Sequence, residues 1–306
     1  MHTFNNAVRL TLLATALIAP SWARGQTGAY SQKVDTSVTL ERGGTLSVSL
    51  HAGRVNVVGT TGSTVRIRGT IERGDMDLRA RSTSVAVSIE QNGSRGARAD
   101  LQIAVPTGTR VVMEGFSTPF SVIGVQGEAK IESLSGSIHV SDAVGKVNVA
   151  SVSGNIDVKR VKGDLRAEAV SGRVDLTDIE GDIESESVSG RVTISGAVSR
   201  LVRAETVSGA VGYSGTFDPG GNYVFRSHSG SLTLGLAADA GATVSLETFS
   251  GNVDSELPVT LEIGSSRSGH ESKFEFRIGN GRSRIVAETF SGDIRIQRST
   301  TRDQRE

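Results

Sequence analysis

The chain has 306 residues, with 33 Lys and Arg against 33 Asp and Glu, so its formal net charge is +0. A neutral chain has no long-range field that would attract nucleic acid or anionic lipid, and we expect no nucleic-acid partner. The absence of cysteine excludes disulfides, thiolate catalysis, cysteine-ligated zinc and a lipid-modified N-terminal cysteine.

Residues 1–25 have the pattern of an export signal. Arg9 precedes an apolar run from Leu10 to Ala19, and Ser21-Trp22-Ala23 follows as a cleavage region. This run is shorter than the roughly 20 residues that a membrane span needs, and no second apolar stretch follows it. We therefore expect an exported protein, periplasmic or extracellular and at the cell surface, with no integral membrane segment after cleavage. A buried N-terminal strand is the alternative.

Residues 26–118 predict irregular, β-rich coils that begin and cap a more regular region. Leu46 to Leu50, Val55 to Val58 and Val65 to Gly69 each alternate apolar and polar residues. A period of two residues is typical of strands with one buried face.

Residues 119–297 carry a repeat that is marked by the dipeptide Ser-Gly. It recurs 18 residues apart at first, and the spacing then widens to 19, 21, 21 and finally 41 residues. The pairs are Ser135-Gly136, Ser153-Gly154, Ser171-Gly172, Ser189-Gly190, Ser208-Gly209, Ser229-Gly230, Ser250-Gly251 and Ser291-Gly292. Residues 298–306 form a polar tail.

Columns of mostly apolar residues appear when these pairs are aligned. They stand six residues before the serine, as at Val147, and three and five residues after it, as at Ile156 and Val158. A further column directly precedes the serine: Leu134, Val152, Val170, Val188, Val207, His228, Phe249 and Phe290. Self-similarity at a fixed period indicates a solenoid.

The repeat unit is a nine-residue strand and turn, which is too small to bury an apolar face alone. Stacked copies form a parallel hydrogen-bonded ladder with a rung about every 4.8 Å. The predicted fold is therefore all-β, a single-stranded parallel β-helix or β-solenoid with 18–21 residues per coil, and we expect it to be right-handed. Bulkier residues such as Tyr223 and Phe225 predict a wider C-terminal end.

The Ser-Gly pairs are interpreted as structural turns. Glycine adopts a positive φ without a steric clash, and the serine hydroxyl can satisfy a turn amide. No His and Asp recur with the serines to activate a nucleophile. We therefore expect no catalytic residue, no cofactor and no enzymatic activity.

A column of carboxylates stands three residues before the serines and includes Glu168, Glu186 and Glu205. Stacked about 4.8 Å apart, like charges repel, and Ca²⁺ could bridge them through oxygen ligands. The alternative is that Arg166 and Arg203 neutralise the column.

A second acidic pair, Asp157 and Asp175, is expected on the opposite outward face beside Arg173 and Arg191. Such a cluster on a parallel β-helix leaves a second function possible, that of a carbohydrate-active enzyme such as a polysaccharide lyase or hydrolase. Those enzymes need acids that converge in a groove, whereas these lie on a straight ladder. The long interval Val259–Arg284 is the only expected place for a cleft.

Ala104-Val-Pro-Thr-Gly108, followed by tandem Val-x-Gly-x-Ile and Ser-Gly-x-Ile-x-Val units, resembles a bacterial family over most of residues 40–297. That family comprises exported β-strand-repeat domains of unknown function that carry the name "putative adhesin". The resemblance implies a β-helical fold and an envelope or surface location, and it implies no catalytic residues.

Three functions follow from this reading. The first, which we favour, is a non-catalytic adhesin or envelope-associated structural or binding protein, with a cell-surface glycan or envelope protein as partner. The others are the carbohydrate-active enzyme and a self-assembling envelope scaffold that joins end to end. The atypical first coils and the polar tail, as caps against edge pairing, favour the first function over the scaffold.

Overall fold

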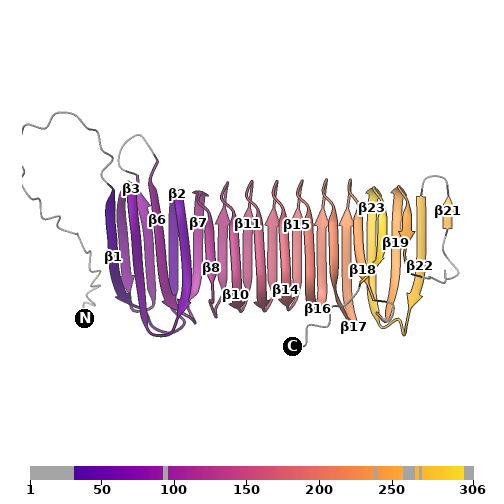
Figure 1. Ribbon diagram of the computed structural model, residues 1–306, viewed down its shortest axis with the longest axis horizontal. Coiled ribbons are helices and arrows are strands. Elements are labelled where there is room, and N and C mark those ends of the chain that lie inside the picture. Colours follow the sequence, from indigo (N-terminus) through magenta and orange to yellow (C-terminus); the bar gives the residue numbers. More distant parts are fainter. Residues whose placement is uncertain (1–30, 92–95, 238–239, 258–265, 269–270, 300–306) are drawn as a thin grey trace, which may run out of the picture.

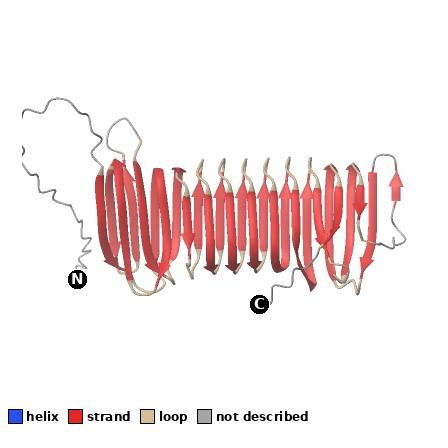
Figure 2. Cartoon of the chain, in the orientation of Figure 1, coloured by secondary structure: helices blue, strands red, loops and turns tan. Residues whose placement is uncertain are grey.

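A computed structural model describes residues 31–91, 96–237, 240–257, 266–268 and 271–299. Within these ranges the chain forms strands and turns and no helix (Figure 2). The strands stand side by side in one long row from the N-terminal to the C-terminal end (Figure 1). This architecture confirms the predicted all-β solenoid. The export signal lies outside the described residues, and the handedness stays a prediction.

The strands of this row form two sheets that pack face to face, which we call sheet A and sheet B. Sheet A contains, in spatial order, β4 (Asp75–Arg81), β5 (Ser84–Glu90), the first half of β2 (Thr45–Thr60), β7 (Arg110–Ser117), β9 (Ala129–Ser133), β11 (Val147–Ser151), β13 (Leu165–Ala169), β15 (Ile183–Ser187), the second halves of β16 (Val192–Thr206) and β17 (Val211–Ser227), β23 (Ser283–Ser291), β19 (Ala242–Ser250), β22 (Glu271–Ile278) and β21 (Ser266–Ser268).

Sheet B packs behind sheet A. It contains β1 (Gln32–Thr39), β3 (Thr64–Arg73), β6 (Arg98–Pro106), the second half of β2, β8 (Phe120–Ile123), β10 (Ile138–Val144), β12 (Ile156–Lys162), β14 (Val174–Glu180), the first halves of β16 and β17, β18 (Leu232–Leu236), β24 (Ile294–Arg298) and β20 (Val253–Ser255). Because β2, β16 and β17 cross from one face to the other, the hydrogen bonding is continuous between the two sheets.

The middle of the solenoid stacks in sequence order and in register. Val147 of β11 lies between Ala129 of β9 and Leu165 of β13, as the 18-residue period requires. The columns that contain Val147, Ile156 and Val158 are buried between the sheets. At the wider C-terminal end, the rings of Tyr213, Tyr223 and Phe225 fill the interior.

Both ends depart from sequence order. The β2 coil lies between the following coil, formed by β5 and β6, and the β7–β8 coil. At the other end, the β23–β24 coil is inserted between β17–β18 and the β19–β20 coil. Antiparallel strands then cover the outermost coils: β4 and β3 at the N-terminal end, β22 at the C-terminal end. At both ends the spatial order of the coils therefore differs from their order in the sequence.

The structure also corrects the reason for the repeated Ser-Gly glycines. None of these eight residues has a positive φ; Gly145, Gly163 and Gly181, at the opposite corner, have φ of 119°, 140° and 146°. A Cβ on Gly154 would lie 2.0 Å from the carbonyl oxygen of Gly136 in the neighbouring coil. Glycine is required because the backbones of neighbouring coils approach each other closely at this corner.

The turn amide is satisfied by a different hydroxyl from the one expected. The N–H of Gly154 donates to Ser151 Oγ at 2.8 Å, and the N–H of Gly136 donates to Ser133 Oγ at 2.8 Å. These serines are buried, whereas Ser135 and Ser153 of the Ser-Gly pairs are exposed.

Candidate functional site

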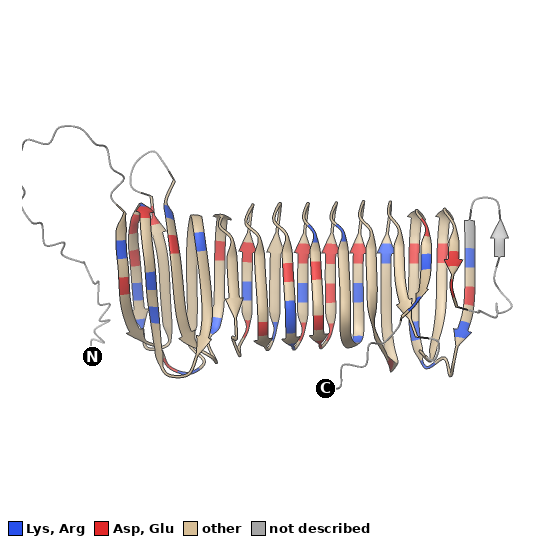
Figure 3. Ribbon diagram, in the orientation of Figure 1, with Lys and Arg blue, Asp and Glu red and all other residues tan. Residues whose placement is uncertain are grey.

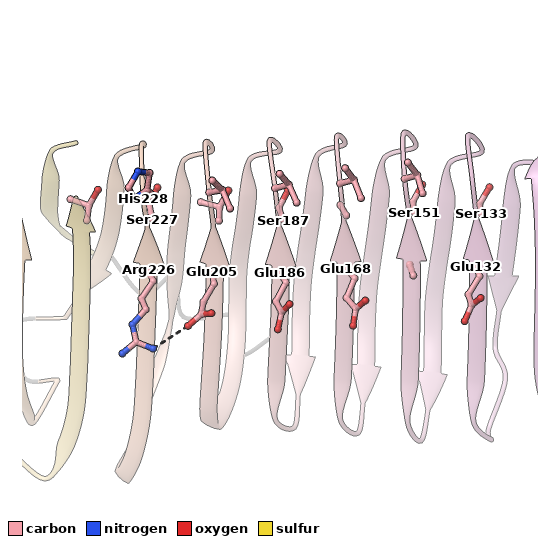
Figure 4. Close-up of a pocket in the computed structure, with 18 of the residues that line it drawn as sticks. Glu132, Ser133, Ser151, Glu168, Glu186, Ser187, Glu205, Arg226, Ser227 and His228 are labelled. Carbon is pink, nitrogen blue, oxygen red and sulfur yellow. Dashed lines mark hydrogen bonds and ion pairs between the residues drawn. The ribbon is translucent and has the colours of Figure 1, made fainter. Parts of the chain in front are cut away.

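A long groove runs along sheet A near the strand ends that lead into the Ser-Gly corner. Its volume is about 1090 Å³, and its lining extends from Glu114 on β7 to Phe249 on β19. Figure 4 shows its glutamates in one row and its serines in a second row closer to the corner. Because strand residues two apart point to the same face, the side chains that follow these serines also face the groove.

One side of the groove is a row of carboxylates, which we call the carboxylate row. Its seven members occupy one register position on consecutive coils, interrupted by Ala150 and Arg226. They are Glu114, Glu132, Glu168, Glu186, Glu205, Glu288 and Glu247. Figure 3 shows the acidic bands along this face with basic bands between them.

Basic side chains on sheet A pair with most of the carboxylate row. Arg166 hydrogen-bonds to Glu168 and to Glu184, and its Nη2 lies 3.7 Å from Glu186 Oε1. The hydrogen bond to Glu168 raises the pKa of Arg166. The row has more carboxylates than cations in contact with it; Arg166, for example, is shared between Glu168 and Glu186. The row therefore keeps an excess of negative charge.

Arg226 occupies a position in the row itself and bridges its two neighbours. It lies 2.8 Å from Glu288 and 3.1 Å from Glu205, and Arg203 also contacts Glu205, at 3.0 Å. The hydrogen bond to Glu288 is the main cause of a raised pKa of Arg226.

The three proposed calcium ligands, Glu168, Glu186 and Glu205, do lie on consecutive coils. Each one has an arginine partner, as the alternative interpretation expects. Among the residues that the structure describes, no group of three or more His, Asp or Glu side chains is arranged to hold a metal ion. The calcium site stays a prediction.

The other side of the groove belongs to an exposed line of mainly apolar side chains, which we call the apolar column. Its members from Leu134 to Phe249 line the groove, and His51 and Phe116 continue the line beyond it. In spatial order it contains His51, Phe116, Leu134, Val152, Val170, Val188, Val207, His228, Phe290 and Phe249. Its eight apolar members are 37% to 50% exposed. An unbroken exposed column of this length is unusual, because single exposed apolar residues are normally scattered.

Stacked aromatic rings form both ends of the apolar column. His51 stacks on Phe116 with ring centroids 5.0 Å apart. At the other end Phe290 lies between His228 and Phe249, with centroid distances of 5.0 and 4.8 Å. His51 and Phe290 belong to the two coils that are inserted out of sequence order. The faces of the inner rings are covered by their neighbours, so their edges point outward.

The hydroxyls that line the groove are engaged within the turns. Ser151 and Ser187 each accept the N–H of the glycine three residues later, and both side chains are almost fully buried. Thr206 accepts the N–H of Gly209 in the same way. These hydroxyls stabilise the corner and are not placed as nucleophiles, since each is held by a backbone group.

The second acidic pair lies on sheet B, on the far side from the groove. Asp157 and Asp175 are register partners. Asp157 contacts Lys159 at 3.0 Å and His139 at 3.3 Å, and Asp175 contacts Arg173 at 2.7 Å. The two carboxylates lie on one ladder and do not face each other across a cleft.

The sequence pattern placed the carboxylate row correctly and also revealed the column that directly precedes the serines, but it was not recognised that this column is exposed. The expectation that a cleft could form only in Val259–Arg284 is wrong: the described part of that interval forms β21, β22 and a turn, and the groove lies elsewhere. The missed signal is strand alternation. Glu132 and Leu134 are two residues apart on one strand, so they face the same way, outward.

Comparison with known proteins gives a family and two solved structures. The model of the Toastrack DUF4097 family matches residues 26–297. A putative cell adhesion protein from Clostridium sporogenes is 11% identical, with 88% of this chain and 100% of that chain covered and a TM-score of 0.25. A putative adhesin from Bacteroides fragilis is 10% identical, with 87% and 97% covered and a TM-score of 0.36. No curated protein matches the chain.

Proposed function

The chain belongs to the Toastrack DUF4097 family, whose function is unknown, and we propose that it is a non-catalytic, exported binding protein of the cell envelope. The groove on sheet A carries this proposal. It combines a continuous apolar surface with a charged border, the composition expected of a binding site.

The N-terminal sequence supports the location. An apolar run of ten residues after Arg9 fits a cleaved export signal. None of the described residues forms a helix that could cross a membrane. We propose that the mature protein is periplasmic or displayed at the surface, and that its partner is an envelope protein or a cell-surface glycan.

The rigid architecture supports a role as a binding surface. The stacked coils hold ten members of the apolar column at a nearly constant spacing of about 4.8 Å. A pre-formed surface binds without the entropic cost of ordering its own side chains. The groove hydroxyls are held by backbone groups, which supports binding over catalysis.

Co-sedimentation with bacterial envelopes tests this proposal. The mature chain is mixed with isolated envelope fractions, and the bound amount is compared for wild type and a Val170→Glu/Val188→Glu variant. We expect wild type to sediment with the envelopes and this variant to remain in solution. Wild type that stays in solution, or a groove variant that binds equally well, would overturn the proposal.

A matched control variant is Val144→Glu/Val198→Glu. Val144 and Val170 are both 45% exposed, but Val144 and Val198 lie on sheet B, away from the groove. This variant should bind the envelopes as wild type does.

A further inference from the structure

The charges around the groove restrict the kind of partner that it can bind. The lining contains seven glutamates and one arginine. Lys130, Arg166 and Arg203 reach in from neighbouring positions, yet carboxylates still outnumber the cations. Arg166 alone is shared among Glu168, Glu184 and Glu186. An anionic partner would be repelled here, and a cationic one attracted.

The two lines of side chains run parallel along the solenoid. The carboxylate row and the apolar column are two residues apart on each strand, which corresponds to roughly 7 Å. The aliphatic centre of the column, from Leu134 to Val207, spans four steps between coils, or about 19 Å. The whole column, from His51 to Phe249, spans about 43 Å. A partner must therefore be elongated, with an apolar line beside a line of positive charge.

From this geometry we propose that the groove binds a basic amphipathic α-helix of another protein, which lies lengthwise along the solenoid. Such a helix is about 10 Å wide and carries an apolar stripe flanked by Lys and Arg. Its stripe packs on Val152, Val170 and Val188, and one flank lies over the carboxylate row. The inference rests on the proposed binding function and names the partner class.

Two other occupants fit less well. A second copy of this chain would bring its own acidic groove, and like charges across an interface oppose association. A glycan stacking on aromatic faces would need free ring faces, but the face of Phe290 on each side is covered, by His228 and by Phe249.

Synthetic helical peptides test the proposal with the full mature chain. The first probe is an amphipathic helix of about 18 residues, or roughly 27 Å, with a leucine stripe flanked by lysines. The second has glutamate in place of every lysine. Binding is measured by fluorescence anisotropy. We expect the lysine peptide to bind at least about tenfold more tightly than the glutamate peptide and to weaken as salt rises. Equal affinities would overturn the proposal.

Substitutions in the groove locate the binding. Val170→Ser/Val188→Ser, which removes apolar contact without adding charge, should weaken the lysine peptide by about tenfold or more, and Val144→Ser/Val198→Ser should leave it unchanged. Glu168→Gln/Glu186→Gln should reduce both the affinity and its dependence on salt. If the groove variant binds the lysine peptide as tightly as wild type does, and all variants melt at the wild-type temperature, the inference is contradicted.

The outcomes separate this inference from the proposed function. If envelope binding requires Val170 and Val188 but the lysine peptide does not bind, the protein is a binding protein with another kind of partner, and the helix is wrong. Anionic phosphatidylglycerol vesicles without peptide should not bind; groove-dependent binding to them would make the partner a lipid surface and overturn the helix proposal.

Discussion

The middle and the two ends of the solenoid are built from similar coils, yet they are assembled differently. From β8 to β15 each coil packs on the coil that precedes it in the sequence. At each end one coil is inserted between two others, and an antiparallel strand closes the stack. The middle can therefore vary in length, whereas the ends have a fixed arrangement.

The inserted coils also carry parts of the apolar column. His51 on the N-terminal inserted coil and Phe290 on the C-terminal one each stack on an aromatic neighbour from a different coil. Because these coils are held on both sides by other coils, they can fray only after their outer neighbours are lost. The ends thus give the aromatic termini of the apolar column a fixed position.

The largest expected effect comes from deleting residues 282–299, which removes β23 and β24. This deletion leaves β17 and β19 without the coil between them, so buried residues such as Tyr223 and Val244 become exposed. We expect the C-terminal coils to lose their structure. Limited proteolysis and circular dichroism would measure this loss.

A deletion of the same length in the middle, residues 155–172, should cost much less. It joins Gly154 to Arg173, so that Ile138 packs beside Val174 in the same register that Ile156 has now. We expect a folded protein with a modestly lower melting temperature. If both deletions destabilise the chain equally, the distinction between middle and ends is wrong.

Glycine substitutions probe the close approach of coils. A Cβ on Gly172 would lie 2.1 Å from the carbonyl oxygen of Gly154, inside the regular stack. Gly172→Val should therefore reduce the free energy of unfolding by about 3 kcal/mol. Gly251→Val, on the outermost β19–β20 coil, makes a similar clash but should cost less because that coil can shift. Chemical denaturation measures both.

Gly212→Val provides the control for these substitutions. The nearest atom to a Cβ at Gly212 is a side-chain carbon of Thr193 at 4.0 Å, and its φ is not in the left-handed region. This variant should unfold as wild type does. A loss as large as that of Gly172→Val would show that close approach is not the cause.

A smaller effect is expected from the buried hydroxyls. Ser151→Ala removes the acceptor of the Gly154 N–H and should cost about 1 kcal/mol. Ser153→Ala changes an exposed side chain and should be neutral. The cost at Ser151 stays moderate because its register partner in the next coil, Ala169, has no hydroxyl and the corner forms there as well. If the two variants behaved alike in denaturation, the role assigned to the buried hydroxyls would be wrong.

The smallest effect is expected in the carboxylate row. Glu168→Gln should change stability by less than about 0.5 kcal/mol, since exposed ion pairs contribute little. Because an arginine already pairs with each of Glu168, Glu186 and Glu205, millimolar Ca²⁺ should leave the melting temperature unchanged. A clear rise with Ca²⁺, lost in Glu168→Gln, would instead support the calcium site.

The 18-residue period predicted the fold class, the buried columns and the position of the carboxylate row. It could not predict the inserted coils, because the Ser-Gly pairs at Gly230, Gly251 and Gly292 share one local pattern, which does not show which coil stacks on which. The outward direction of Val152 and Val170 was available from strand alternation. The reason for glycine at the Ser-Gly corner could be found only from the structure, because it depends on the distance between the backbones of neighbouring coils.

Disulfide trapping tests the inserted C-terminal coil most directly, since the natural chain contains no cysteine. His228→Cys/Phe290→Cys places two thiols on adjacent coils, about 4.8 Å apart, within disulfide reach. His228→Cys/Phe249→Cys separates them by two coils, or about 9.6 Å. The structure predicts that oxidation links residues 228 and 290 and not residues 228 and 249. Efficient linkage of 228 to 249 alone would mean that the coils stack in sequence order and would contradict both the fold and the continuous apolar column.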